Sequence, residues 1–358
     1  MIAVILGTRP EIIKMSPVIR ECEAKELDFF ILHTGQHYSY EMDKMFFDEL
    51  ELPLPWHNLE IGSGSHAEQT GRILAGVERA LVEERPDIVL VQGDTNTVLA
   101  GALAAKKLHI RVGHIEAGLR SFDRSMPEEV NRVVTDHISD YLFAPTKTAE
   151  TNLLNEGIDR DNIHVMGNTV VDALYQNLEI SRKKSGILAE LGLKPKEYFL
   201  VTAHRQENVD SEERLKNIIE CLRLIHNKYS LPVIFPMHPH TVKRIDEFGI
   251  DTEDINVIKP LGYLSFLQLE ANARLILTDS GGIQEEACIL GVPLVTLRDN
   301  TERPETLDVG SNVVAGTDPV KIFESVGWMM RKDNRWKNPF GDGDSAKRIV
   351  RLLQAEQN

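Results

Sequence analysis

Short apolar runs alternate with longer stretches of helical period along the chain. In the first half the apolar runs predict strands at Ala3–Leu6, Phe29–His33, Ile88–Gln92, Arg111–Ile115, Tyr141–Ala144 and Ile163–Met166. The amphipathic stretches between them predict helices over Glu11–Ala24, Glu41–Leu50, His66–Glu84, Thr97–Leu108, Pro127–Ser139 and Lys147–Glu156. This alternation is typical of βαβ units that build a parallel sheet.

The second half repeats the pattern. Its predicted strands are Phe199–Ala203, Val233–Phe235, Val257–Ile258, Leu275–Thr278 and Leu294–Thr296, and its predicted helices are Glu212–Lys228, Thr241–Phe248, Leu264–Asn272, Ile283–Leu290 and Pro319–Arg331. We therefore expect an α/β fold of two Rossmann-like, doubly wound domains.

The domain boundary is predicted from a change in composition. A polar segment, Ser181–Gly186, is followed by Gly192 and Pro195, which is typical of a linker. We expect residues 1–180 to form the first domain and residues 190–340 the second, with a C-terminal helix within 341–358 that is available to pack back on the first domain. Because ligands of such sheets bind beyond the strand C-termini, a cleft between the domains is the expected ligand site.

Charge and cysteine usage exclude several classes of function. The net charge of −15 argues against a nucleic-acid or anionic-membrane partner. Apolar runs stay under ten residues, and the N-terminus enters a strand without a basic region, so neither a membrane span nor a signal peptide is predicted. The three cysteines are far apart, which favours buried thiols in a reducing cytoplasm.

Acidic residues stand at three predicted strand-to-helix transitions of the first half. Asp94 and Glu116 come directly after two of these strands, and Glu128 and Glu129 open the helix that follows. Taken singly, Asp94 also fits a helix cap, and at least one of the two glutamates fits a surface charge. Acids at several strand-to-helix transitions of one domain are nevertheless a signature of acid/base chemistry.

The same transitions carry candidate phosphate-binding groups. Arg9 begins a helix after the first strand, with Lys14 one turn later, although that motif alone also fits an ordinary turn. His204 follows the first strand of the second half, where an imidazole beside an arginine favours phosphate binding or proton transfer.

The strongest phosphate motif is Ser280-Gly281-Gly282, a turn between strand and helix whose N–H groups can hold a diphosphate. Glu286, further along that helix, is placed to accept ribose hydroxyls, and Arg303 is placed to close over the phosphates.

Other motifs are absent from the sequence. It has no Walker A lysine pattern, no Gly-x-Gly-x-x-Gly turn after the first strand and no Gly-x-Ser-x-Gly elbow. His238 and His240 flank a proline without cysteine partners, which favours a structural or ligand-lining role, so we expect no metal.

Seven motifs in order resemble the non-hydrolysing UDP-N-acetylglucosamine 2-epimerases, from the first strand to about residue 316. They are Gly7-Thr8-Arg9-Pro10-Glu11, Gly93-Asp94-Thr95, His114-Ile115-Glu116-Ala117-Gly118-Leu119-Arg120, Pro127-Glu128-Glu129-x-Asn131-Arg132, His204-Arg205-x-Glu207-Asn208, Asp279-Ser280-Gly281-Gly282-x-Gln284-Glu285-Glu286 and Thr301-Glu302-Arg303-Pro304-Glu305. The resemblance implies a GT-B fold, a UDP-sugar substrate, a homodimer, and neither cofactor nor metal.

The resemblance also implies roles for individual residues. Asp94, Glu116 and Glu128 match the catalytic carboxylates, with Lys14 nearby and His204 added to the catalytic set. The remaining matches are substrate contacts: Ser280, Gly281 and Gly282 for the diphosphate, Glu286 for the ribose, Phe266 near the uracil, and Arg9 and Arg303 for phosphate and cleft contacts.

Two segments depart from the bacterial pattern of this family, namely Thr34–Met42 and the residues Gln206, Val209 and Asp210 after His204. They line the region where bacterial members bind a second substrate molecule as activator, so the resemblance does not carry allosteric activation over to this chain. Four alternatives stay open: an epimerase for a related UDP-sugar such as a diacetamido uronic acid, a hydrolysing epimerase, a GT-B glycosyltransferase, and an inactive nucleotide-sugar sensor.

Overall fold

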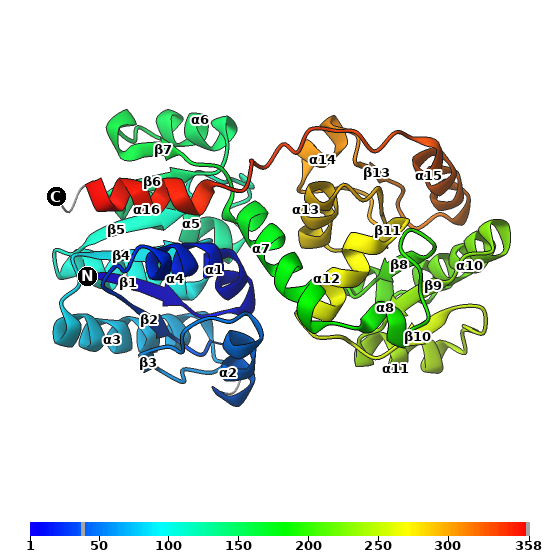
Figure 1. Cartoon of the computed structure of the whole chain (residues 1–358), viewed down its shortest axis with the longest axis horizontal. Helices are drawn as coiled ribbons and strands as arrows, with labels where there is room; N and C mark the ends of the chain where they lie inside the picture. Colours follow the sequence, from blue (N-terminus) through cyan, green and yellow to red (C-terminus); the bar gives the residue numbers. More distant parts are fainter. Residues whose placement is uncertain (37–39, 356–358) are drawn as a thin grey trace. The chain divides into compact units, whose positions relative to one another are not determined.

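Alternating strands and helices build two parallel sheets, one in each half of the chain (Figure 1). The computed structural model describes residues 1–36 and 40–355, with the side chains of residues 40–43 left out. The chain divides into one unit of Met1–Gln176 with Phe340–Asn358, and a second unit of Asn177–Pro339. The division falls inside a helix, α7 (Thr169–Lys184), a few residues before the predicted linker.

The first unit contains a seven-stranded sheet of order β3-β2-β1-β4-β5-β6-β7. Every pairing is parallel. Its strands are β1 (Ile2–Leu6), β2 (Phe29–His33), β3 (His57–Asn58), β4 (Ile88–Gln92), β5 (Arg111–Ile115), β6 (Tyr141–Ala144) and β7 (Ile163–Val165). The sequence pattern predicted all of these strands except β3, which is too short to produce an apolar run.

The helices of the first unit are α1 (Arg9–Ala24), α2 (Tyr40–Glu49), α3 (His66–Glu84), α4 (Asn96–Lys107), α5 (Pro127–Ile138), α6 (Lys147–Asn155), the 3-10 turn η1 (Arg160–Asn162), the first half of α7, and α16 (Ser345–Ala355). Helix α16, near the C-terminus, belongs to the first unit and packs against α1. Its residues Ile349, Val350 and Leu353 are at most 2% exposed, so the apolar stripe of α16 supplies the contact.

The second unit contains a six-stranded parallel sheet of order β10-β9-β8-β11-β12-β13. Its strands are β8 (Phe199–Thr202), β9 (Val233–Pro236), β10 (Asn256–Ile258), β11 (Leu275–Thr278), β12 (Leu294–Thr296) and β13 (Asn312–Val314). The sequence pattern missed β13, an edge strand of three residues that begins with a polar side chain. The helices are α8 (Ile187–Glu190), α9 (Gln206–Val209), α10 (Glu212–Tyr229), α11 (Pro239–Phe248), α12 (Tyr263–Asn272), α13 (Gly281–Leu290), α14 (Pro304–Asp308) and α15 (Pro319–Arg331).

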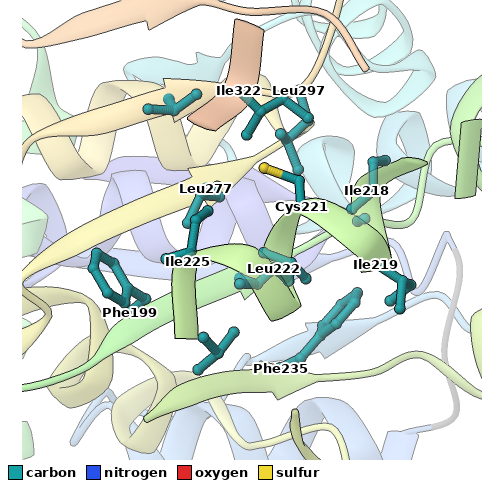
Figure 2. Packing of buried hydrophobic residues seen from close by; sticks show 14 of the residues in the cluster. Phe199, Ile218, Ile219, Cys221, Leu222, Ile225, Phe235, Leu277, Leu297 and Ile322 are labelled. Carbon is teal, nitrogen blue, oxygen red and sulfur yellow. The ribbon is translucent and has the colours of Figure 1, made fainter. Parts of the chain in front are cut away.

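The core of the second unit shows why these segments fold as they do. Ile218, Leu222 and Ile225 of α10 recur at helical spacing and are at most 1% exposed. They face Phe199 and Phe235 of two neighbouring strands (Figure 2). The three cysteines are buried free thiols, as predicted. None of the helices in the described part of the chain is both long and apolar enough to span a membrane.

Each sheet has one point where the strand order reverses direction. In the first sheet it lies between β1 and β4, and in the second between β8 and β11. Loops that leave adjacent strands at such a point diverge to opposite faces, which opens a binding crevice at the strand C-termini. The turns at Arg9 and Asp94 flank this point in the first unit, and those at His204 and Ser280 flank it in the second.

Candidate active site

The turn after β1 is organised by a buried acid, Glu11. Its carboxylate accepts a hydrogen bond from the Gly7 N–H at 2.5 Å and another from the Thr95 hydroxyl in the β4–α4 turn. Glu11 is 2% exposed, and burial raises its pKa from 4.5 to about 7. The same first turn of α1 carries Arg9, whose guanidinium lies 5.5 Å from the centroid of the Phe46 ring. Glu11 therefore fixes the two turns at the switch point to each other.

Asp94 follows β4 but does not cap the next helix. The cap of α4 is Thr95, whose hydroxyl accepts from the Val98 N–H. The Asp94 carboxylate instead pairs with Arg132 of α5 at 2.6 Å, while Asn131 donates to the Asp94 carbonyl at 2.9 Å. A partly exposed carboxylate bonded to a guanidinium is held in a defined orientation, which suits acid/base chemistry better than a structural cap does.

Glu116 follows β5 and lies beside the β4 turn. Its carboxylate accepts from Lys14 Nζ and from Gln92 Nε2, both at 2.6 Å, and the residue is 7% exposed. A Cβ built on Gly93 would lie 3.8 Å from Glu116 Oε2, which places this carboxylate next to the residue that precedes Asp94. The first unit therefore brings Lys14, Asp94 and Glu116 to one edge of its sheet.

Glu128 and Glu129, adjacent on α5, have different environments. Glu129 is 1% exposed and accepts from the N–H groups of Ser121 and Phe122 at 3.0 Å, so it organises the preceding loop and is not a surface charge. Glu128 is half-buried and lies one helical turn before Arg132, on the same face of α5. Because Arg132 binds Asp94, that face of α5 is turned toward the β4 turn.

In the second unit, Asp279 joins the turns after β8 and β11. This fully buried carboxylate accepts from the N–H groups of His204 and Arg205, each at 3.0 Å in the shorter contact, and from Asn208 Nδ2 at 3.1 Å. The His204 ring lies 3.4 Å from Asp279 and its side chain is 54% exposed. The structure therefore places His204 beside Ser280 and leaves its ring accessible.

The turn Ser280–Gly282 begins helix α13. Ser280 occupies the cap position but its hydroxyl makes no capping bond, and its neighbour Gly281 adds no side chain. The N–H groups of a first helical turn have no partners within the helix, so they are available to an anion. Arg303 lies near α13, where its guanidinium binds Glu285 Oε2 at 3.3 Å.

Two glutamates of the second unit lie together. Glu270 of α12 is fully buried, and its pKa is raised well above the usual value, first by burial and then by the neighbouring Glu286 of α13. Glu286 is half-buried. Phe266, on the same helix as Glu270, packs against the apolar cluster that includes Leu200 and Leu269.

His238 and His240, which flank a proline, make bonds within the protein. His238 caps α11 by accepting from the His240 N–H, and His240 pairs with Asp210 at 2.8 Å. Within residues 1–36 and 40–355 no group of three or more histidine, cysteine, aspartate or glutamate residues is arranged to hold a metal ion. Of the departing segments named above, residues 37–39 and the side chains of residues 40–43 lie outside the description, whereas Gln206 and Val209 bound the short helix α9.

The supporting roles of several of these side chains were not predicted from the sequence. Thr8-x-x-Glu11 is a capping-box pattern that could have identified Glu11, and helical spacing could have placed Arg132 beside Glu128. Glu270 gave no such signal, because a charged residue in an amphipathic helix is expected to face water.

Comparison with known proteins covers both the fold and the family. A glycosyltransferase structure from Rickettsia africae matches with a TM-score of 0.60 at 12% identity over 99% of this chain and 98% of that one, which shows the shared GT-B fold alone. A Pseudomonas aeruginosa UDP-2,3-diacetamido-2,3-dideoxy-D-glucuronate 2-epimerase is 41% identical over 98% of this chain and 99% of its own length.

The similarity is higher to archaeal proteins. A UDP-N-acetylglucosamine 2-epimerase of Methanococcus maripaludis is 58% identical over 99% of both chains. A Methanocaldococcus jannaschii UDP-GlcNAc 2-epimerase, solved in complex with UDP-GlcNAc and UDP, is 58% identical over 99% of both chains with a TM-score of 0.85. The family model described as UDP-N-acetylglucosamine 2-epimerase matches residues 20–354. By these matches the chain belongs to the UDP-N-acetylglucosamine 2-epimerase family.

Proposed function

We propose that this chain is an isomerase that converts UDP-N-acetylglucosamine reversibly to UDP-N-acetylmannosamine by inverting C2 of the sugar. The observation that carries the proposal is its full-length similarity to UDP-N-acetylglucosamine 2-epimerases, one of them solved with UDP-GlcNAc and UDP. Two observations support it independently. In the first unit, Asp94 and Glu116 are each ion-paired with a cation, and in the second unit Ser280 at the start of α13 makes no capping bond.

The chemistry explains why several acids are needed. The C2 proton is not adjacent to a carbonyl group, so simple deprotonation is out of reach. In an anti elimination a carboxylate removes the C2 proton, the C1–O bond to UDP breaks with its electron pair leaving on UDP, and a C1=C2 double bond forms in 2-acetamidoglucal. An acid then returns a proton to C2 from the opposite face, and UDP adds back to C1, so atoms and charge balance.

In this proposal Asp94, Glu116 and Glu128 supply the carboxylates for both proton transfers. Arg132 pairs with Asp94 and Lys14 pairs with Glu116, each at 2.6 Å, so each carboxylate is held in a defined orientation. An ionised, oriented carboxylate is what a general base requires.

The second unit binds the nucleotide in this proposal. Gly281 and Gly282 donate N–H groups to the diphosphate, Ser280 donates its hydroxyl because its N–H already donates to Thr278 Oγ1 at 3.0 Å, and Glu286 accepts the ribose hydroxyls. His204 and Arg303 of this unit, and Arg9 of the first unit, contribute positive charge or protons as UDP leaves, and Phe266 packs near the uracil. Such donors stabilise the departing diphosphate, which must be retained for re-addition.

Incubation of the purified protein with UDP-N-acetylglucosamine alone in deuterium oxide tests the proposal. Deuterium at C2 of recovered UDP-N-acetylglucosamine and UDP-N-acetylmannosamine is the expected result. Turnover only when a sugar acceptor is added would favour a glycosyltransferase, and free N-acetylmannosamine with UDP would show a hydrolysing enzyme. Tight UDP binding with no turnover would show a sensor.

A second substrate is favoured by one observation, the similarity to the Pseudomonas 2-epimerase named above. A parallel reaction with the UDP-2,3-diacetamido uronic acid, compared by kcat/KM, decides between the two sugars, and we expect UDP-N-acetylglucosamine to be preferred. We further propose that the enzyme acts as a homodimer, as the family resemblance implies. Sedimentation equilibrium at the assay concentration checks this, and a monomeric mass for the active enzyme would contradict it.

A further inference from the structure

A cluster of four charged residues, of which Glu156 is partly exposed, lies behind the acids of the first unit. His114 of β5 and Asp136 of α5 are both fully buried, with His114 Nδ1 at 2.6 Å from Asp136 Oδ1. Arg120 binds the second oxygen of Asp136 at 2.7 Å and Glu156 at 2.7 Å. Two cations and two anions therefore balance, which lets the cluster persist in the interior.

The hydrogen bonds of His114 fix its protonation state. Nδ1 faces the Asp136 carboxylate, and Nε2 lies 2.8 Å from the carbonyl oxygen of Gly93. Both partners can only accept, so each ring nitrogen must carry a proton and the ring is an imidazolium. The carboxylate of Asp136 and the Gly93 carbonyl raise the pKa of His114 against the opposing effect of burial.

This cluster reaches all three elements that carry the proposed catalytic acids. Gly93 directly precedes Asp94. The Gly93 N–H donates to the Ile115 carbonyl at 3.1 Å and the Gly93 carbonyl lies beside the His114 ring, so both backbone groups of Gly93 are bound to β5. Asp136 also accepts from the Gly118 N–H at 3.1 Å, two residues after Glu116. Asp136 itself belongs to α5, the helix of Glu128.

The backbone of these turns needs such support. Glu116 has φ +69°, a left-handed conformation that costs a residue with a side chain roughly 1–2 kcal/mol. The neighbouring glycines Gly93 and Gly118 also have positive φ, +86° and +81°. The His114 ring at the Gly93 carbonyl and the Asp136 carboxylate at the Gly118 N–H add to the other bonds that hold these turn conformations.

We propose that His114 is a positioning residue of the epimerisation reaction, whose imidazolium holds the Gly93 carbonyl and thereby the Asp94 carboxylate in its reactive position. The proposal rests on the proposed function and adds a residue that touches no substrate. Its physical basis is preorganisation: a displacement of a reacting group by about 1 Å can cost on the order of 100-fold in rate. The bound UDP, which contacts the second unit, is not expected to sense this displacement.

The test compares His114→Leu and His114→Gln with the wild-type enzyme. For His114→Leu we expect kcat to fall by about 100-fold while the Kd for UDP changes by less than about 3-fold. The kcat of His114→Gln, whose amide can still donate to one partner, should lie between those of His114→Leu and the wild-type enzyme. The matched control is His33→Leu, which removes another buried histidine at the end of a strand of the same sheet and should keep kcat within about 3-fold of wild type.

Several results would overturn the positioning role. They are a folded His114→Leu enzyme with wild-type kcat, a UDP affinity that falls in step with kcat, or an equal loss in His33→Leu. If neither His114 variant folds, ¹⁵N NMR of the wild-type enzyme at pH 8 decides: a doubly protonated, solvent-protected imidazolium supports the proposal, and a spectrum with neutral histidines alone refutes it. A wild-type enzyme that fails to exchange deuterium at C2 refutes the proposed function itself, which is a separate outcome.

Discussion

The switch-point edges of the two sheets hold their polar groups in different ways. In the first unit the candidate acids are bound by charged side chains, Asp94 by Arg132 and Glu116 by Lys14. In the second unit the Ser280 hydroxyl makes no capping bond, and the N–H groups of the first turn of α13 have no partners within the helix. The difference matches the two tasks: proton transfer needs carboxylates of defined charge and direction, whereas a diphosphate brings its own charge and needs donors.

Each unit also contains a buried carboxyl group whose pKa is raised. Glu11 is 2% exposed and bonded to backbone N–H groups and Thr95, whereas Glu270 is fully buried beside Glu286. Burial raises the pKa of both, but only Glu11 has neutral donors that stabilise its charged form. The comparison predicts that the two acids respond differently to the same amide substitution.

The largest expected effect comes from removing the Asp94 carboxylate at the switch-point edge of the first sheet. Asp94→Asn removes a carboxylate while keeping its shape, so kcat should fall by about 1000-fold, whereas the Kd for UDP should rise by no more than about 3-fold. Steady-state kinetics and calorimetry measure the two quantities. Asp161→Asn, at an exposed site of the same unit, is the control and should behave as wild type. Equal losses in turnover and UDP affinity would make Asp94 a ligand contact instead.

The next effect concerns stability and pH. Because the folded-state pKa of Glu11 is raised from 4.5 to about 7, its neutral form stabilises the fold fully below pH 4.5, and this contribution is lost as pH rises through 7. The loss amounts to at most about 3 kcal/mol. Glu11→Gln cannot titrate, so its stability relative to wild type should increase between pH 4.5 and 7. Denaturation followed by Trp56, with Trp328 and Trp336 replaced by Phe, reports on the first unit, and parallel pH profiles of the two proteins would contradict the prediction.

A smaller effect is expected at the ribose-binding position of the second unit. Glu286→Gln exchanges a charged acceptor for a neutral one, which should weaken UDP binding by about 10-fold. It should weaken 2′-deoxy-UDP binding less, because one ribose hydroxyl is already missing. Titration calorimetry with both nucleotides measures this, with exposed Glu324→Gln as the matched control. An unchanged preference for UDP over the deoxy nucleotide would remove Glu286 from the ribose contact.

The smallest effect is expected at Glu270. Burial and Glu286 raise the pKa of Glu270 well above its usual value, which favours the neutral form, and Glu270→Gln replaces it with a neutral group of similar shape. UDP affinity should stay within about 2-fold. Glu270→Leu, which leaves Glu286 without this neighbour, should weaken UDP binding more. A loss above about 10-fold in the glutamine variant alone would mean that Glu270 is charged in the enzyme.

Local patterns in the sequence determined the fold class and most of the elements. Runs such as Ile88–Gln92 and Leu275–Thr278 are buried on both faces, so their continuous apolar character predicted strands of a parallel sheet, and the structure has strands with these bounds. The turn residues between such runs also marked Asp94, Glu116 and Ser280, because polar groups directly after a buried strand have few structural reasons to be there. The short strands β3 and β13 escaped prediction because pairing with a neighbour, and not their own side chains, makes them strands.

Only the tertiary structure decided which side chains support these residues. Arg132 reaches Asp94 across 38 positions of sequence, and Lys14 reaches Glu116 across 102. Sequence patterns report which face of an element is buried, but not which distant element covers it. A buried charge such as His114 or Asp136 is stable only through partners that folding brings together, and so its role becomes visible only in three dimensions.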